Sequence, residues 1–366
     1  MKKISPDLAS WLLHRNQAQA AKRQRLAGLA KSQASSGKRN RSTGWRTAVI
    51  RIPELLAAED HEKRGALYKI VQSVVHALEH PYTVVRLDFT KTQKLYPGGT
   101  LVLLAYLELL LQEHPGRIRA RCFPKSLAAQ LLRHFGLADR LGINVADSQP
   151  TDDSVVNWRY LTGTGADGEK IADLLQSYKE LTSVDPPEGL YDVLSEALIN
   201  VRHHAYPEAS NVPEAMRRWW LFARFNEPKN NRPGNLYIAI YDIGVGIQNS
   251  LRVRLQGSAE LMSSMTDEIL SLLPMGKSRK LERLLLKRAV EHPRSSTGLS
   301  HRGLGLPEMR DFVIQTSSGR LYIISGEAQY SCSAAQNASD CMACDPAFPG
   351  TLILWSIPIQ PKELAS

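Results

Sequence analysis

Hydrophobic and polar positions along the chain follow two periods, which predict where strands and helices lie. Short apolar runs bounded by turn residues are typical of strands, whereas apolar residues three or four apart are typical of helices. In the first part of the chain the two patterns alternate, with strands expected at 47–52, 83–89 and 117–123 and helices at 63–78, 100–114 and 127–143. Strands that alternate with helices predict a small α/β domain over residues 47–145.

The second part of the chain, residues 155–366, has a different order of elements, and turn-forming residues at 146–154 predict a linker before it. Expected strands are 155–161, 217–225, 235–244, 319–326 and 350–359, and expected helices are 168–181, 190–206 and most of 248–302. The turn-rich stretch NEPKNNRPG joins the second and third of these strands and predicts a hairpin. We therefore expect a second α/β domain, with the long segment 327–350 between its last two strands.

The stretch LYDVLSEALINVRHHAY, residues 190–206, is expected to form a helix with one apolar face and one polar face. At about 100° per residue, the apolar face contains Leu190, Leu194, Ala197, Leu198, Val201 and Ala205. The opposite face contains Asp192, Glu196, Asn200 and His203. Glu196 and Asn200, four residues apart, lie one above the other. Their oxygens suit a hard cation such as Mg²⁺ and the orientation of a water molecule, as phosphate-handling sites require.

Charge is distributed unevenly. Eleven of the 46 Lys and Arg residues, and one of the 36 acidic residues, lie in residues 1–46, so 35 of each remain in the rest of the chain. The formal net charge of +10 therefore belongs to an N-terminal arm. Such an arm is interpreted either as a solvated, disordered leader, as a transit peptide, or as a contact to nucleic acid, acidic lipid or an acidic partner.

The apolar content places no segment in a membrane, because no run of 18 apolar residues and no signal-peptide block occurs. A cytoplasmic protein is expected. The four cysteines, too few for a disulfide framework in a chain of this size, are expected to be reduced. Cys332, Cys341 and Cys344 provide three candidate zinc ligands, one short of a closed structural site unless Asp340 or Asp345 joins them.

Two glycine-rich stretches accompany the polar helix. Asp242-Ile-Gly244-Val-Gly246 ends a predicted strand, and Gly303-Leu-Gly305-Leu306 opens a predicted helix. An aspartate at a strand end can accept a hydrogen bond from an exocyclic amine of a base, and glycines let the backbone approach a ligand closely. Backbone N–H groups at a helix start can bind phosphate.

The order Glu-x-x-x-Asn, Asp-x-Gly-x-Gly, Gly-x-Gly and Gly-Thr, ending at Gly350-Thr351, resembles the GHKL ATPase superfamily of gyrase, a heat-shock chaperone, histidine kinases and a mismatch-repair protein. The resemblance covers about residues 155–360. It implies a Bergerat-type α/β sandwich that binds ATP and Mg²⁺. Within the superfamily, the sequence EALINVRHHAYP most resembles that of the serine kinases that act as anti-sigma factors.

The resemblance also implies roles for individual residues. Glu196 would orient or deprotonate the attacking water or hydroxyl, and Asn200 would hold Mg²⁺ between the phosphates. Asp242 would bind the adenine amine, supported by Thr351. The remaining nucleotide-binding candidates are Gly244 and Gly246 near the base and sugar, Gly303 and Gly305 near the phosphates, and His203 and Arg302.

The resemblance also implies a lid over the phosphates, at about residues 247–302. This segment is rich in positive charge. Residues 276–302 contain eight Lys and Arg against two Glu, and Lys277, Arg279 or Arg302 could reach a γ-phosphate. Most of these charges are expected only to solvate helices.

The order of elements in residues 47–145 resembles the STAS domain of anti-sigma-factor antagonists. In that family a phosphorylatable Ser precedes a helix that begins with Gly, but here the loop reads Tyr96-Pro97-Gly98-Gly99-Thr100. Thr100 is therefore expected to be an ordinary helix cap.

Together these expectations describe an Mg²⁺-dependent ATPase or serine/threonine-kinase-like phosphotransferase, regulated through the STAS-like domain and a protein partner. A homodimer is among the assemblies that the sequence allows. Two alternatives stay open: an ATP-gated switch with little turnover, and a protein that binds nucleic acid through its arm.

Overall fold

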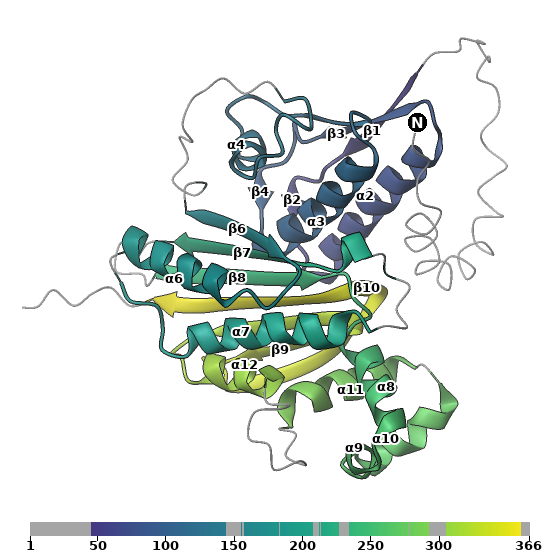
Figure 1. The fold of residues 1–366 in the computed structure, drawn as a ribbon, viewed down its shortest axis with the longest axis vertical. Helices are drawn as coiled ribbons and strands as arrows, with labels where there is room; N and C mark the ends of the chain where they lie inside the picture. Colours follow the sequence, from purple (N-terminus) through teal and green to yellow (C-terminus); the bar gives the residue numbers. More distant parts are fainter. Residues whose placement is uncertain are drawn as a thin grey trace, which may run out of the picture.

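The computed structural model describes residues 45–143, 155, 157–182, 184–207, 212, 214–226, 234–276, 278–292 and 305–359. Its elements stack as alternating layers, with a small sheet, two helices, a large sheet and a second group of helices (Figure 1). The expected arm, the linker 146–154, Arg302 and Gly303 lie outside the described residues, apart from Trp45 and Arg46 at the end of the arm.

The N-terminal region is an α/β unit, as the alternating pattern predicts. Its main elements are β1 (Arg46–Arg51), α2 (His61–Glu79), β3 (Thr83–Asp88), α3 (Pro97–Glu113), β5 (Ile118–Arg121) and α4 (Leu127–His134). The three strands are parallel, in the order β1-β3-β5. Because both crossovers run in the same direction across the sheet, right-handed connections place α2 and α3 on the same face. A parallel pair of two-residue strands, β2 (Leu55–Leu56) and β4 (Lys94–Leu95), was not expected, since two residues carry no period.

Helix α3 begins three residues earlier than the pattern predicts. Its N-cap is Tyr96, and Pro97 occupies the first turn, where a missing N–H costs nothing. Gly99 is required there, because a Cβ would lie 2.7 Å from the backbone of Ala57. The expectation that Thr100 caps the helix is wrong: Thr100 lies inside α3, is buried, and its hydroxyl has no hydrogen-bond partner among the described residues.

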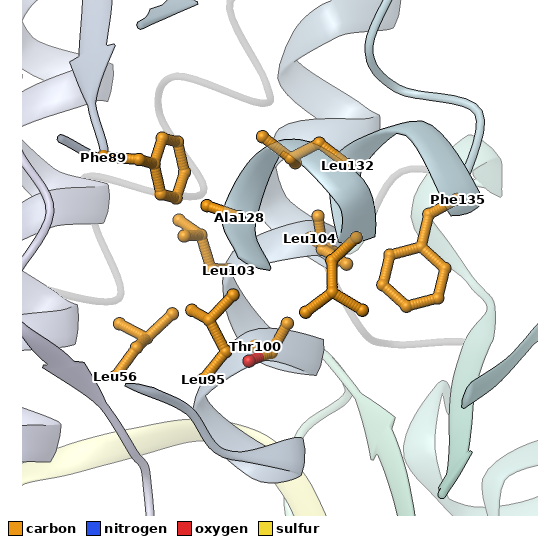
Figure 2. A pocket seen from close by; sticks show the side chains of 10 residues that line it. Leu56, Phe89, Leu95, Thr100, Leu103, Leu104, Ala128, Leu132 and Phe135 are labelled. Atoms are coloured by element: carbon orange, nitrogen blue, oxygen red, sulfur yellow. The ribbon is translucent and has the colours of Figure 1, made fainter. Parts of the chain in front are cut away.

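A small apolar pocket lies between α3 and α4, and Thr100 is the one residue with a polar side chain among those that line it (Figure 2). Its lining residues are Leu56, Phe89, Leu95, Thr100, Leu103, Leu104, Ala128, Leu131, Leu132 and Phe135. This pocket shares no residue with the polar helix that the sequence singles out.

The large sheet belongs to the second region. Its strands are β6 (Trp158–Gly163), β7 (Trp219–Asn226), β8 (Gly234–Asp242), β9 (Arg320–Ser333) and β10 (Ala338–Ile359). The spatial order is β6-β7-β8-β10-β9, and every neighbouring pair is antiparallel, so the expected β7–β8 hairpin is confirmed. Helices α6 (Gly168–Thr182), α7 (Leu190–Asn200) and α12 (Gly305–Ile314) cover one face (Figure 1).

The segment 327–350 was expected to be a separate connector between the last two strands. Instead it extends the β9–β10 hairpin. Pairing continues from Ser356↔Arg320 to Ala338↔Ser333, with register shifts around Phe348. The charged and small residues in this segment obscure the alternation that would predict strands. Extension separates the cysteines: Cys332 and Cys341 pack on the α7 side of the sheet, whereas Cys344 packs on the α3 side.

The expected lid is a helical insert with a core of its own. It consists of α8 (Ile247–Gly257), α9 (Ala259–Ser263), α10 (Asp267–Leu272), the short 3-10 helix η4 (Leu273–Met275) and α11 (Arg279–Glu291). Its core residues are Leu251, Leu255, Leu261, Met265, Ile269, Leu281, Leu285 and Ala289. Arg252 and the buried Glu282 form an ion pair between α8 and α11. Helix α11 also packs against β9 and β10.

The two regions, which were expected to be separate domains, share one hydrophobic core. Apolar residues of α2 and α3 form a single cluster with the second face of the large sheet, which contributes Trp220, Phe222, Ala239, Tyr241, Phe348, Leu352 and Leu354. Helix α3 is mostly apolar and is buried along most of its length, which fits a helix packed between two sheets. None of the helices in the described ranges is both long and apolar enough to span a bilayer.

Candidate functional site

The polar helix is divided into two kinds of helix. Helix α7 covers Leu190–Asn200, and a π-helical turn, η2, covers Val201–Ala205. All six residues of the expected apolar face are buried. The π-turn, a feature often found at functional sites, begins directly after Asn200 and was not expected from a uniform helical period.

Glu196 and Asn200 lie beside the first residue of α12. A Cβ placed on Gly305 would be 2.8 Å from Glu196 Oε2 and 2.9 Å from Asn200 Nδ2. Only glycine therefore lets the start of α12 approach this polar face so closely. Of the second glycine pair, the structure brings Gly305 to the site.

The Asn200 side chain has an unsatisfied donor. Its Nδ2 is buried and has no hydrogen-bond partner among the described residues. A buried amide without a partner is costly, so the position fits a ligand that offers oxygen atoms. An amide at this position can donate from nitrogen to a phosphate oxygen and coordinate Mg²⁺ through its own oxygen. The Asn200 amide is therefore suited to a phosphate-bearing ligand, with or without Mg²⁺.

Three effects raise the pKa of Glu196. Burial is the largest, followed by the negative charges of Glu308, in the first turn of α12, and Asp192, one turn earlier on α7. Each disfavours the ionised carboxylate. Raised carboxyl pKa values move a group toward the range in which it exchanges protons near neutral pH.

Asp242 ends β8 on the same side of the sheet as α7. It shares the strand parity of Ile238 and Ile240, which pack in the core that includes α7, and it is buried. Its Oδ1 accepts a hydrogen bond from the Gly244 N–H at 2.7 Å, which forms a turn directly after the strand.

The polar helix and this turn are in direct contact. Val245 N–H donates to the carbonyl of Ala205, the last residue of η2, at 2.8 Å. A Cβ on Gly244 would lie 2.4 Å from the same carbonyl oxygen. The two motifs are thus joined through backbone, about one helical turn beyond Asn200.

Thr351 lies directly opposite Asp242 in the β8–β10 register. The preceding Gly350 has φ +82°, and a Cβ there would overlap the Asp242 carbonyl oxygen. Gly246, with φ +84°, is the N-cap of α8. The strand ends and the start of α8 therefore meet around Asp242.

Two further polar residues complete this region, and the sequence did not single them out. The hydroxyl of Ser325 on β9 accepts a hydrogen bond from the Ile247 N–H at 2.9 Å. The same hydroxyl lies 3.2 Å from the Thr351 hydroxyl. Gln248 is buried and donates from Nε2 to the Ser325 carbonyl at 2.7 Å. A lone Ser at a strand end and a Gln in a first helical turn carry no signal that distinguishes them from ordinary residues.

Several expected residues are placed elsewhere. His203 is exposed on η2. Arg279 pairs with Asp345 of β10 at 2.6 Å. Arg302, Gly303 and Lys277 lie outside the described residues. Because Cys344 faces away from the other two cysteines of the hairpin, the candidate zinc site does not assemble, and no cluster of three or more His, Cys, Asp or Glu suited to a metal occurs within the described ranges.

No protein-family model matches the sequence, and no curated protein shows significant similarity to it.

Proposed function

We propose that the second region binds ATP with Mg²⁺ as a histidine-kinase-like domain and hydrolyses it or transfers its γ-phosphoryl group. The observation that carries the proposal is the contact between the two motifs. The Ala205 carbonyl joins the helix bearing Glu196 and Asn200 to the turn after Asp242, with an N–H···O distance of 2.8 Å between Val245 and Ala205. The residues proposed to bind the base and the phosphates therefore lie on one side of one sheet.

Asp242 is suited to the base. Its carboxylate already accepts the Gly244 N–H, which orients it at the strand end, and a carboxylate is the acceptor that an exocyclic amine requires. The glycines around it, Gly244, Gly246 and Gly350, keep the surrounding backbone free of Cβ atoms, so a planar ligand can approach closely.

Asn200 and Glu196 are suited to the phosphate end. Mg²⁺, when bound with ATP, neutralises phosphate charge. Asn200 would hold it with its amide oxygen, and Glu196 would accept a proton from the attacking water or hydroxyl at a carboxylate oxygen. The raised pKa of Glu196 supports this assignment, because a carboxyl with a pKa nearer neutrality is the better base.

The N-terminal region would regulate this site. Its helices α2 and α3 support the second face of the same sheet, so a change in their packing reaches β8 and β10, which carry Asp242 and Thr351. We propose that this region acts as a STAS-like domain that binds a protein partner. We also propose that the protein is cytoplasmic.

Turnover and binding test the proposal separately. We expect wild-type protein to bind ATP more tightly with Mg²⁺ than without it. Asn200→Ala should lose the Mg²⁺-dependent part of the affinity, and Asp242→Asn should lose affinity with or without Mg²⁺. Asp173→Asn, an exposed carboxylate on α6, is the matched control. Unchanged Mg-ATP affinity in both site variants would refute the nucleotide site.

The Glu196→Gln variant decides between an enzyme and an ATP-gated switch. Loss of a general base costs about 10²- to 10⁴-fold in rate, so its ATP turnover should fall by at least about 10²-fold while ATP binding is retained. Equal turnover in Glu196→Gln and wild type, with ATP still bound, would instead support a switch with little turnover.

A further inference from the structure

The outer face of the small sheet, opposite α2 and α3, is exposed. Along β1, β3 and β5 the inward positions are buried or half-buried, whereas most outward positions are exposed. The outward positions fall into cross-strand rows, one joining Val49, Arg86 and Arg119 and the next joining Arg51, Asp88 and Arg121. We call these two rows the arginine face.

Positive charge dominates this face. Arg51, Arg86, Arg119 and Arg121 are exposed, and none of them forms an ion pair within the part of the chain that is described. The acid of the two rows, Asp88, accepts hydrogen bonds from the Thr90 hydroxyl at 2.6 Å and the Thr90 N–H at 3.0 Å. After residue 46 the chain contains equal numbers of acidic and basic residues, so this concentration is local.

Exposed aromatic side chains lie at both ends of the small sheet. Trp45, which is 63% exposed, precedes β1, and Tyr82, which is 62% exposed, precedes β3. Their rings form an edge-to-face pair with centroids 6.2 Å apart. Phe123, two residues after Arg121, is 61% exposed. Large aromatic rings left this open to water are available for stacking.

We propose that the arginine face binds single-stranded nucleic acid. A guanidinium group can donate two hydrogen bonds to the oxygens of one phosphate and can also stack on a base. Lysine provides only a point charge. Four arginines with no lysine among them therefore favour a phosphodiester strand as the ligand. The aromatic side chains at the two ends would stack on unpaired bases, which a duplex does not offer. This inference is independent of the nucleotide site.

The composition of the basic arm agrees with this assignment. Residues 1–44 contain ten Lys and Arg and one acidic residue. Steering of a polyanion depends on the summed charge of the whole chain.

Fluorescence anisotropy of the full chain with a labelled single-stranded oligonucleotide of about 20 nucleotides tests the proposal. We expect Arg86→Ser/Arg119→Ser to weaken binding about tenfold or more at low salt, and to reduce the slope of log K against log[salt] by about 1.4, since each phosphate contact on a single strand contributes about 0.7. Arg51→Ser/Arg121→Ser should give the same loss, so the result does not depend on one variant folding. Arg254→Ser/Arg320→Ser removes two exposed arginines from α8 and β9 as the matched control.

Other outcomes would overturn the proposal. If both arginine-face variants bind like wild type while a chain lacking residues 1–44 does not bind, the arm alone is the site. If the variants lose binding to phosphatidylserine vesicles or to an acidic peptide but not to the oligonucleotide, the partner is a membrane or a protein. A preference for duplex over single strand would refute the stacking role of Trp45, Tyr82 and Phe123.

Discussion

The carboxylate of Glu108 on α3 accepts a hydrogen bond from the indole Nε1 of Trp220 on β7 at 2.7 Å, where α3 packs against the large sheet. The same carboxylate accepts the Tyr160 hydroxyl at 2.7 Å and pairs with Arg218 at 3.0 Å. Three donors from the second region therefore converge on one acid from the N-terminal region.

Replacing Glu108 should destabilise the whole chain. In Glu108→Ala, the partly buried Arg218 loses its ion-pair partner, and losing a hydrogen bond to a charged group costs about 1.5–3 kcal/mol of unfolding free energy. Urea denaturation followed by tryptophan fluorescence and by circular dichroism should show one transition at lower urea with both probes. Two separate transitions, with only one shifted, would contradict a shared core.

Glu113, the last residue of α3, should behave in the opposite way. Its Oε2 is buried without a hydrogen-bond partner among the described residues, burial raises its pKa, and it lies in the last helical turn, where the dipole disfavours negative charge. Glu113→Gln should therefore stabilise the protein at neutral pH by about 0.5–1 kcal/mol.

The sign of the pH dependence follows from the raised pKa of Glu113. The folded state binds the proton more tightly than the unfolded state, so ionisation costs stability at high pH and this cost disappears as pH falls through the folded pKa. The advantage of Glu113→Gln, measured by urea denaturation at a series of pH values, should shrink toward acid pH. An advantage that is constant with pH would rule out the charge as its cause.

The pH–rate profile should report Glu196. Because its pKa is raised above 4.5, the base form, and with it kcat/KM for ATP, should be lost as pH falls through a value above that of an ordinary glutamate. Glu308→Gln removes a neighbouring negative charge, so the acid limb should move to lower pH. Asp173→Asn serves as the control, and a limb that Glu308→Gln leaves in place would contradict the assignment.

Close backbone contact at Gly244 should make the site intolerant of a single methyl group. Gly244→Ala would place Cβ 2.4 Å from the Ala205 carbonyl oxygen, forcing η2 and the turn after Asp242 apart, and should abolish ATP binding. Gly65→Ala, within α2, meets nothing within 4 Å and should instead stabilise the protein by up to about 1 kcal/mol. Isothermal titration and thermal unfolding measure the two effects. Tight ATP binding by Gly244→Ala would show that this contact is dispensable.

Much of the fold follows from local pattern. The buried face of α7 has the helical period from Leu190 to Leu198, and the β7–β8 hairpin has its turn residues in sequence. The contact between Asp242 and Gly244 is also local, because the turn follows directly from the strand.

What the sequence could not show depends on tertiary packing. Nothing in the helical period marks the π-turn after Asn200, because a widened turn changes the direction of side chains without changing their polarity. Ser325 and Gln248 gain their role only because β9 lies beside β10 and against the start of α8. The packing of α3 on Trp220 and Phe222 joins two faces that are each merely apolar in sequence.

A chain cut between the two regions would leave the large sheet bare on one side. The uncovered surface would include Trp220, Phe222, Tyr241, Leu352 and Leu354, all buried against the N-terminal helices in the intact molecule. An apolar surface of this kind promotes self-association, so neither half is expected to remain monodisperse alone. The two regions are therefore expected to fold and unfold together as one unit.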